Sequence, residues 1–232
     1  MWKMTGWFKP RVINERYKLY MFDIIRVFTL LVRPWYLWRF RAVTDAKVAL
    51  GSGPYYAAHW INVEVNPAFK KDVWQDLRDA LPFREDSVAI VYSAHVFEHL
   101  FINEFHWVLK ECYRILKPGG ILRICLPCLR KNIEAYVRKD ESFFRWEPAE
   151  LDPFKDPTLA AKFSRNVLVD GSHKNMFDYE SLKHILSFIG FRDVTQADYR
   201  QSALLSAEDL QALEPEELAY RGWNSFVAEA RK

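Results

Sequence analysis

The stretch from Lys47 to Pro127 constrains the fold of this 232-residue chain more than any other part. It alternates short apolar runs of strand length with turn residues and one longer segment of helical periodicity. The runs that we expect to form strands are residues 47–50, 61–65, 73–77, 87–92 and 121–126. Strands that alternate with helices are typical of parallel sheets. We therefore predict an α/β fold with a Rossmann-like, doubly wound and mostly parallel sheet.

Two helices and a C-terminal strand pair complete the predicted sheet. Residues 103–116 place their apolar side chains on one helical face, and a turn rich in proline and glycine at 117–120 ends this helix. A second helix is predicted over 179–189. The runs 191–198 and 225–230 are expected to pair antiparallel, so that the sheet ends in an antiparallel C-terminal edge strand.

Two parts of the chain lie outside this pattern. Residues 131–169 are charged and lack clear periodicity, so we predict an irregular segment there, within a substrate-side insertion that spans 131–175. Residues 1–45 form an extension ahead of the domain, which covers 46–232. The first 41 residues hold nine Lys or Arg against two acids, and four of the nine Trp, whereas the rest of the chain is net acidic.

The extension is predicted to contain a helix from Tyr17 to Val32, which Pro34 ends because proline blocks helix continuation. The helix is apolar over most of its circumference and must bury that surface. One interpretation is packing against the following domain, and the other is a basic, Trp-rich anchor in the membrane interface. The apolar runs are too short to span a bilayer, and the layout of a secretory signal is missing.

The three cysteines, Cys112, Cys125 and Cys128, do not make a disulfide framework in a chain of this length. Cys125 and Cys128 form a CxxC, but two further ligands at metal-binding spacing are not visible in the sequence. Both lie at the end of a predicted buried strand, where cysteine behaves as a small hydrophobic residue. We therefore expect a reducing, cytoplasmic setting.

Residues suited to ligand binding follow the predicted strands, where open α/β sheets bind their ligands. Gly51 and Gly53 follow the first strand and let the backbone approach a ligand closely. Tyr56 stands where a third glycine would complete a dinucleotide fingerprint, which counts against a nicotinamide dehydrogenase. Glu64, at the end of the second strand, can accept hydrogen bonds from both ribose hydroxyls of an adenosine-containing cofactor.

Asp76 and Leu77 follow the third strand and can offer an acceptor to an adenine amino group and a backbone N–H to its ring. Each of these features alone has an ordinary structural interpretation, as a turn residue or a solvated acid at a strand end. Their succession along the chain is the informative observation.

Four segments in order resemble the motifs of class I S-adenosylmethionine-dependent methyltransferases. They read VALGSGP, WINVEVNP, DLRDALPFREDSVAIVYSAHVFEHL and LKECYRILKPGGILRICLP. The similarity is greatest to a small methyltransferase-domain group often associated with cell-envelope polysaccharide biosynthesis. It covers residues 46–130, and 170–232 through HKNMFDYESLKHILSFIGFRDV and SFVAEARK.

The resemblance implies S-adenosylmethionine as cofactor and a role for each strand-end residue. It implies that Gly51, Ser52 and Gly53 lie beside the methionine part and the ribose, and that Glu64 binds the ribose hydroxyls. It also implies that Asp76 and Leu77 contact the adenine, and that Ser93 and His95 line the methyl-donor pocket. The family more often has Asp in place of Glu64, Cys in place of Ser52, and Phe-Asp in place of Val88-Ala89.

Methyl transfer to a hydroxyl needs a base, and histidine is the usual choice. The candidates are His95, His99 and His173, of which His95 is nearest a strand end. His95 and His99 enclose Glu98, but HVFEH differs from the HExxH pattern of zinc proteases, so no metal site is predicted.

We predict an enzyme that methylates a small molecule or a saccharide or glycolipid acceptor by O-methylation. We expect it in the cytoplasm, in peripheral contact with the membrane through residues 1–41. A catalytically degenerate scaffold bound to membrane or to a glycan-synthesis complex is the alternative, but such a scaffold need not keep Gly51, Glu64 and Asp76. Nucleic-acid modification is a further alternative that the basic, aromatic N-terminus prompts. The sequence has no recognisable RNA-binding motif to support it.

Overall fold

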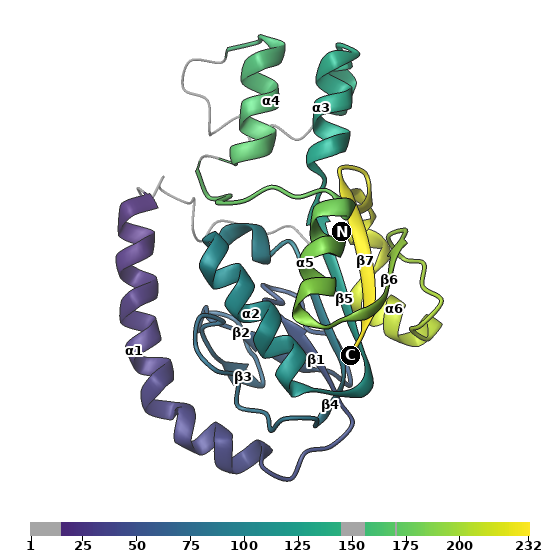
Figure 1. Cartoon of the computed structure of the whole chain (residues 1–232). Helices are drawn as coiled ribbons and strands as arrows, with labels where there is room; N and C mark the ends of the chain where they lie inside the picture. Colours follow the sequence, from purple (N-terminus) through teal and green to yellow (C-terminus); the bar gives the residue numbers. More distant parts are fainter. Residues whose placement is uncertain (1–14, 145–155, 170) are drawn as a thin grey trace.

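The computed structural model describes residues 15–144, 156–169 and 171–232 (Figure 1). Within them, seven strands form one sheet in the order β3-β2-β1-β4-β5-β7-β6. The pairs from β3 to β5 are parallel, and β7 is antiparallel to both of its neighbours. The strands are β1 Ala46–Leu50, β2 Ile61–Glu64, β3 Val73–Trp74, β4 Val88–Ala94, β5 Leu116–Pro127, β6 Arg192–Ala197 and β7 Ser225–Arg231. The predicted Rossmann-like, mostly parallel sheet is confirmed, and the predicted antiparallel C-terminal pair forms with β6 outermost.

Strand β1 lies at the centre of the parallel part, between β2 and β4. Leu50 pairs with Val63 on one side and with Ser93 on the other, so β1, β2 and β4 end at the same level of the sheet. The chain leaves β1 toward β2 and returns to β4 on the opposite side. Such a switch point is where open α/β sheets bind ligands.

Helices cover the two faces of the sheet unequally. Helices α2 (Ile102–Ile115) and α5 (Tyr179–Ile189) lie together on one face (Figure 1). On the other face, α6 (Ala207–Leu213) packs Leu213 against alternate strand residues such as Ala49 and Tyr92. The connections within residues 51–87, all of them described, contain no α-helix, so strand and helix alternate only from β4 onward.

Residues 129–168 contain two helices where an irregular segment was predicted, and that prediction is wrong for the described residues. Helices α3 (Leu129–Val137) and α4 (Leu159–Leu168) lie side by side beyond the carboxyl ends of the strands (Figure 1). A buried hydrogen bond of 2.5 Å from Asn166 Nδ2 to Asn132 Oδ1 joins them. This contact is polar, so it leaves little trace in a hydrophobic pattern. The short helix η2 (Glu141–Phe143) follows α3.

Helix α1 (Glu15–Phe40) continues through Pro34, so the predicted end at that proline is wrong. The turns beyond Pro34 bury Tyr36 and Phe40 against the domain. The Tyr36 hydroxyl accepts a hydrogen bond from the Trp74 backbone N–H at 3.1 Å, and the Phe40 ring lies 5.3 Å from that of Phe83. These tertiary contacts offset the hydrogen bond that proline removes from a helix. The first fourteen residues of the extension lie outside the described residues.

A buried ion cluster fixes the segment that covers the glycine loop. The Arg123 guanidinium in β5 donates to Glu214 at 2.8 Å and to Glu229 of β7 at 2.7 Å, and all three side chains are within 2% of complete burial. Glu214 follows α6 directly and precedes the short helix η3 (Glu216–Gly222). The cluster therefore holds the start of η3 against the sheet. Burial of this kind is tolerated because both carboxylates are paired and hydrogen-bonded.

All three cysteines are buried and free. Burial raises the pKa of the Cys125 thiol to about 12, far from a reactive thiolate. The interpretation of the CxxC as small hydrophobic packing is therefore confirmed.

Candidate functional site

The loop after β1 needs glycine for reasons of conformation and space. Gly51 and Gly53 have φ values of +66° and +55°, in the left-handed region that side chains disfavour. A Cβ on Gly51 would lie 2.4 Å from the Val96 Cγ2 atom, well inside contact distance. The Gly51 N–H donates to the Val63 carbonyl at 2.8 Å and ties the loop to β2.

Glu64 closes this loop from the end of β2. Its carboxylate accepts hydrogen bonds from the backbone N–H groups of Gly53 at 2.8 Å, Val65 at 3.0 Å and Asn66 at 3.1 Å. A carboxylate offers about four acceptor positions. Ser52 Oγ beside it is buried with no hydrogen-bond partner within the described part of the chain. An orphaned hydroxyl at this place fits a ligand that supplies the missing partner, as a cofactor carboxylate or ribose can.

The residues predicted at the adenine are already engaged. Asp76 is buried and forms an ion pair with Arg78, whose Nη2 atom lies 2.8 Å from Asp76 Oδ2. Leu77 belongs to the hydrophobic core. The neighbouring Gln75 has a buried Oε1 atom for which the described residues provide no partner. An adenine amino group therefore has to share Asp76 with Arg78, and Gln75 is a further acceptor that the sequence did not suggest.

Ser93 lies inside the sheet and not on an open surface. It is 1% exposed, and its hydroxyl donates to the Leu50 carbonyl at 3.3 Å. It thus joins the ends of β4 and β1. Its predicted place in the lining of the donor pocket stays a prediction.

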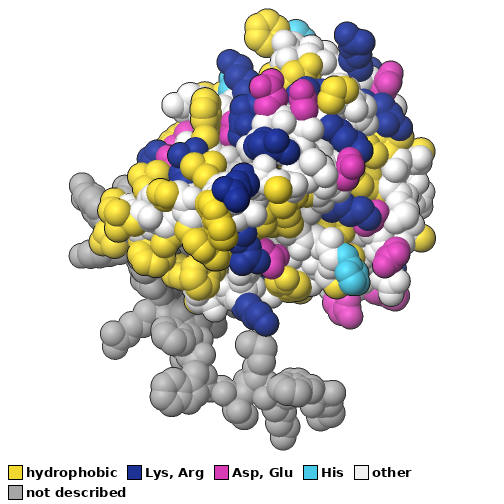
Figure 2. Space-filling model, turned by 90° about the horizontal axis from the view of Figure 1, so that it is seen from below, with side chains coloured by type: hydrophobic (Ala, Val, Ile, Leu, Met, Phe, Trp, Pro, Cys, Tyr) yellow, Lys and Arg dark blue, Asp and Glu magenta, His cyan; other side chains and the backbone are white. Residues whose placement is uncertain are grey.

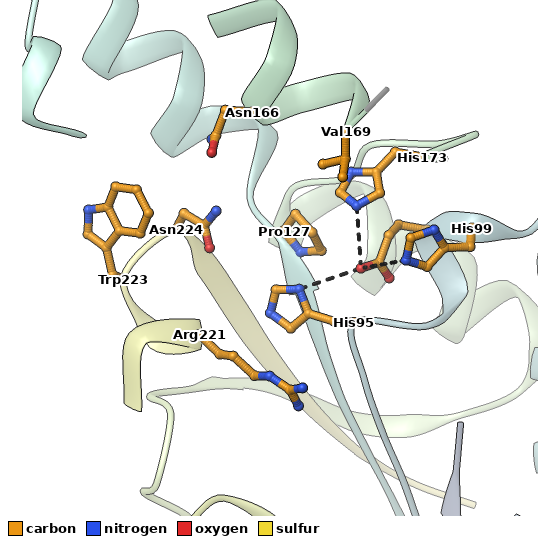
Figure 3. Close-up of a pocket in the computed structure, with 10 residues that line it drawn as sticks. His95, His99, Pro127, Asn166, Val169, His173, Arg221, Trp223 and Asn224 are labelled. Atoms are coloured by element: carbon orange, nitrogen blue, oxygen red, sulfur yellow. Dashed lines mark ion pairs between the residues drawn. The ribbon is translucent and has the colours of Figure 1, made fainter. Parts of the chain in front are cut away.

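Two hollows adjoin these strand ends. A narrow one of about 40 Å³ lies against Gly51 and Ser52 and is bounded by Tyr55 and Arg221. The Arg221 guanidinium stacks over the Tyr55 ring at 5.5 Å and narrows this hollow further. A larger cavity of about 710 Å³ lies beyond it, and Arg221 borders that cavity also (Figure 3). Arg221 therefore separates a donor-side hollow from a cavity large enough for a small organic molecule.

The large cavity gathers residues from the segment directly after β4, the end of β5, α4 and the loop after it, and the end of η3 with the turn before β7 (Figure 3). Its lining consists of His95, Glu98, His99, Pro127, Asn166, Val169, His173, Arg221, Trp223 and Asn224. The three predicted catalytic histidines are thus brought together, although His173 is far from the others in sequence.

His95 stands directly after β4 in a left-handed conformation with φ of +55°. Such backbone strain in a residue other than glycine gathers at functional sites. Its Nδ1 atom lies 3.5 Å from Glu98 Oε1, and its Nε2 atom lies 2.9 Å from Ser225 Oγ. Both ring nitrogens therefore face a polar neighbour, and Ser225 is a site residue that the sequence analysis missed.

His99 and His173 face Glu98 from two further sides (Figure 3). Each of their Nε2 atoms lies 3.9 Å from Glu98 Oε1, and the two rings meet edge to face at 4.9 Å. The loop that carries His173 is fixed to the short helix η1 (Phe97–His99), because the backbone N–H groups of Lys174 and Asn175 donate to the Glu98 carbonyl at 2.7 and 3.2 Å.

Glu98 is an acidic side chain in a buried position. It is 1% exposed, and both carboxylate oxygens lack a hydrogen-bond partner within the described part of the chain. Burial opposes ionisation, but His95, His99 and His173 outweigh it and hold the pKa of the Glu98 carboxyl below its usual value. Burial lowers the pKa of His173, which favours its neutral ring.

Sequence reasoning missed the far side of the cavity. Asn166 comes from α4, which was not predicted, and Trp223 and Asn224 precede β7 in a segment treated only as a connection. The one available signal was position, since Asn224 and Ser225 mark the start of the predicted last strand. No sequence pattern marked Arg221 as a residue of the cavity.

Comparison with known proteins agrees with this arrangement. The model of the methyltransferase-domain family matches residues 55–124. A search of curated proteins found no match. Among solved structures, an S-adenosylmethionine-dependent methyltransferase from Archaeoglobus fulgidus is 19% identical over 90% of this chain and 94% of its own, with a TM-score of 0.52.

Two other solved structures match at lower TM-scores. A methyltransferase solved with the Trm112 activator of Haloferax volcanii is 17% identical over 90% of this chain and 95% of its own, at 0.48. An S-adenosylmethionine-dependent methyltransferase of Thermotoga maritima is 18% identical over 96% of this chain and 97% of its own, with a TM-score of 0.46.

The domain match covers β2 to β5, and the Archaeoglobus structure shares the fold over nearly the whole chain. These findings show a match to the methyltransferase domain over residues 55–124 and a fold shared with an S-adenosylmethionine-dependent methyltransferase, with the glycine loop of this chain at the switch point of the sheet.

Proposed function

We propose that the enzyme transfers the methyl group to a hydroxyl of a small molecule, saccharide or glycolipid bound in the cavity beside His95. The observation that carries the proposal is the adjacency of the glycine loop and this cavity across the single residue Arg221. A donor held at the loop then has its sulfonium near the acceptor. Holding donor and acceptor in line supplies on the order of 7–11 kcal/mol in well-oriented cases.

The donor residues follow from their positions. Gly51, Ser52 and Gly53 bind the methionine part and the ribose, and Glu64 accepts from a ribose hydroxyl at the position that its three backbone N–H donors leave free. Asp76 and Leu77 contact the adenine. The unpartnered Ser52 hydroxyl and the left-handed glycines support this placement.

The acceptor chemistry involves the histidines. As the acceptor oxygen bonds to the methyl carbon, the S–CH₃ bond breaks and the hydroxyl proton leaves. His95 takes this proton, directly or through Ser225 Oγ at 2.9 Å from its Nε2 atom. His99 and His173 position Glu98, which faces His95 Nδ1 at 3.5 Å and orients the ring.

The experiment is a methyl-transfer assay with labelled S-adenosylmethionine against nucleotide sugars, glycolipids and small amines. His95→Ala is expected to keep cofactor affinity and to lower turnover about 10²–10⁴-fold, the usual contribution of a general base. His184→Ala, an exposed histidine on α5, is the matched control and should leave both unchanged. Full turnover in the His95 variant would refute its role, and methylation of amines alone would refute transfer to a hydroxyl.

We also propose that α1 binds the surface of an anionic membrane, at its cytoplasmic face. On α1, the polar side chains turn inward: Arg26 forms an ion pair with Asp79 at 2.6 Å, and Arg33 donates to the Ala80 carbonyl at 3.2 Å. The outward face is apolar and forms a patch that is exposed among the described residues (Figure 2). The patch comprises Ile24, Val27, Phe28, Leu30, Leu31, Trp35, Leu37 and Trp38, all at least 41% exposed.

Charge complementarity favours a lipid surface as the occupant. Arg39 and Arg41 stack over Trp35 and Trp38 at 5.2 and 5.4 Å, so cations border the aromatic end of the patch. Tryptophan and basic side chains together suit the headgroup region of an anionic bilayer. None of the described helices is long and apolar enough to cross a membrane, so the contact is peripheral.

Co-sedimentation with vesicles tests this contact. The full chain is expected to bind vesicles that contain phosphatidylglycerol, and Leu31→Ser with Trp38→Ser should reduce binding at least about tenfold. Phe188→Ser is the matched control, since Phe188 is 85% exposed on α5, away from the patch. The proposal would be contradicted if the Leu31→Ser, Trp38→Ser variant bound vesicles as well as the wild type. It would also be contradicted if the wild type were a dimer and this variant a monomer, because the patch would then bind a second copy of the chain.

A further inference from the structure

The Glu98 carboxylate lacks the partners that a buried charge requires. Buried carboxylates in proteins accept several hydrogen bonds, face a guanidinium or ammonium, or coordinate a metal ion. Here neither oxygen has a donor at ordinary hydrogen-bond distance among the described residues, and the nearest polar groups are the ring nitrogens of three histidines at 3.5–3.9 Å. The Glu98 carboxylate therefore lacks a close partner that would balance its charge.

The two flanking imidazoles present their lone pairs to this carboxylate. His99 Nδ1 lies 3.1 Å from the Ser172 carbonyl, and His173 Nδ1 lies 2.9 Å from the Val167 carbonyl. A carbonyl oxygen only accepts, so each Nδ1 carries a proton, and in the neutral form of each ring Nε2 is an acceptor. A carboxylate oxygen that faces two such Nε2 atoms needs a cation between them, either a proton on a ring or a metal ion.

We propose that Glu98, His99 and His173 bind a divalent transition-metal ion through one carboxylate oxygen and two Nε2 atoms. The three ligand atoms lie within 4.8 Å of one another. Bonds of about 2.0–2.1 Å in a tetrahedral zinc site separate ligands by roughly 3.3 Å, so small side-chain rotations close the set around an ion. Two imidazoles and one carboxylate suit Zn²⁺, Mn²⁺ or Fe²⁺.

The surroundings resemble the outer layer of known metal sites. Histidines that bind metals almost always donate their other ring N–H to a carbonyl or carboxylate, which fixes the tautomer. Both rings do so here. The ligands are also rigidly placed, because the His173 loop is bonded through its backbone to the Glu98 carbonyl. The HVFEH pattern could not predict this site, since the third ligand comes from a loop distant in sequence.

The ion would lie in the wall of the 710 Å³ cavity, because Glu98, His99 and His173 all line it. A metal ion lowers the pKa of a bound hydroxyl and orients it. This catalytic use rests on the proposed function, whereas the binding of the ion does not. His95 Nδ1 lies 3.5 Å from the same Glu98 oxygen, so Nδ1 stays next to the ion while Nε2, beside Ser225, remains the nitrogen that receives the proton.

The test measures binding on the full chain without turnover. Chelator-treated protein is titrated with CoCl₂, followed by visible absorption, and with ZnCl₂ by calorimetry. We expect one ion per chain, displacement of Co²⁺ by Zn²⁺, and a loss of affinity of at least about a hundredfold in Glu98→Gln and His173→Ala. Retained affinity for S-adenosylhomocysteine in both variants shows that they fold. His184→Ala, the exposed histidine on α5, should bind the ion as the wild type does.

Two results would overturn the site. One is that the wild type binds neither Co²⁺ nor Zn²⁺ saturably, and the other is that Glu98→Gln and His173→Ala bind the ion as tightly as the wild type does. Methyl transfer at full rate in the chelator-treated chain would overturn the catalytic use of the ion. Failure of the proposed function itself is distinguishable, because it appears as an absence of methyl transfer to hydroxyls while the ion still binds.

Discussion

Two buried acidic clusters lie near the same sheet and differ in how their charge is balanced. At Arg123, two carboxylates share one guanidinium, with separations of 2.7 and 2.8 Å. At Glu98, one carboxylate faces three imidazoles at 3.5–3.9 Å and has no hydrogen-bond donor in the described structure. The first cluster is complete, and the second is open toward a cavity. This difference is why we propose that the Arg123 cluster serves the fold and the Glu98 cluster serves a ligand.

Removal of the shared cation should have the largest effect. Arg123→Met leaves Glu214 and Glu229 buried without a counter-charge, which typically costs about 3–5 kcal/mol. We expect the free energy of unfolding to fall by this amount, as measured by urea denaturation. A loss below about 1 kcal/mol would show that the cluster does not hold the fold.

A smaller effect is expected from Glu229→Gln in the same cluster. Glu229 accepts from Arg123 at 2.7 Å and from Ser202 Oγ at 2.6 Å. The amide keeps the shape but weakens the charge-assisted bond, so we expect a loss of about 1–3 kcal/mol. The same denaturation measurement checks it, and unchanged stability would place Glu229 outside the balance of the cluster.

The matched substitution in the other cluster should change stability least. Glu98→Gln removes a carboxylate that only histidine rings at 3.5–3.9 Å stabilise, so the chelator-treated variant should lose less stability than Glu229→Gln, within about 1 kcal/mol of the wild type. Added Zn²⁺ should raise the melting temperature of the wild type and not that of the variant. A loss above about 2 kcal/mol without metal would make Glu98 a structural residue like Glu229, and the contrast between the clusters would fail.

The two clusters also show which features of the structure local sequence patterns can predict. Local signals predicted each strand, and the helix over 179–189 has the predicted bounds. The strand limits are less accurate: β3 ends at Trp74 and not at residue 77, and β5 begins at Leu116, so the predicted turn at 117–120 belongs to that strand. The local signals placed Gly51 and Glu64 at the switch point, because the ends of β1 and β2 are readable from apolar runs and turn residues. The pairing of Arg123 with Glu214 spans 91 residues, and no local pattern encodes such a contact.

The errors have the same origin. Pro34 predicted a helix end, but Tyr36 and Phe40 bury beyond it and hold the helix together. The sequence placed His95 and His99 beside Glu98 but did not show that His173 joins them, because long-range backbone hydrogen bonds bring its loop to Glu98. Tertiary contacts decided both, and the sequence alone does not contain them in a readable form.

The most direct test of the two-site account is calorimetric titration with S-adenosylhomocysteine. The wild type and Glu98→Gln should bind one equivalent with equal affinity, because Glu98 borders the acceptor cavity and not the glycine loop. Gly51→Arg should abolish binding, since even a Cβ at Gly51 would lie 2.4 Å from Val96 Cγ2. An absence of binding by the wild type, or unchanged binding by Gly51→Arg, would contradict the assignment of the donor site.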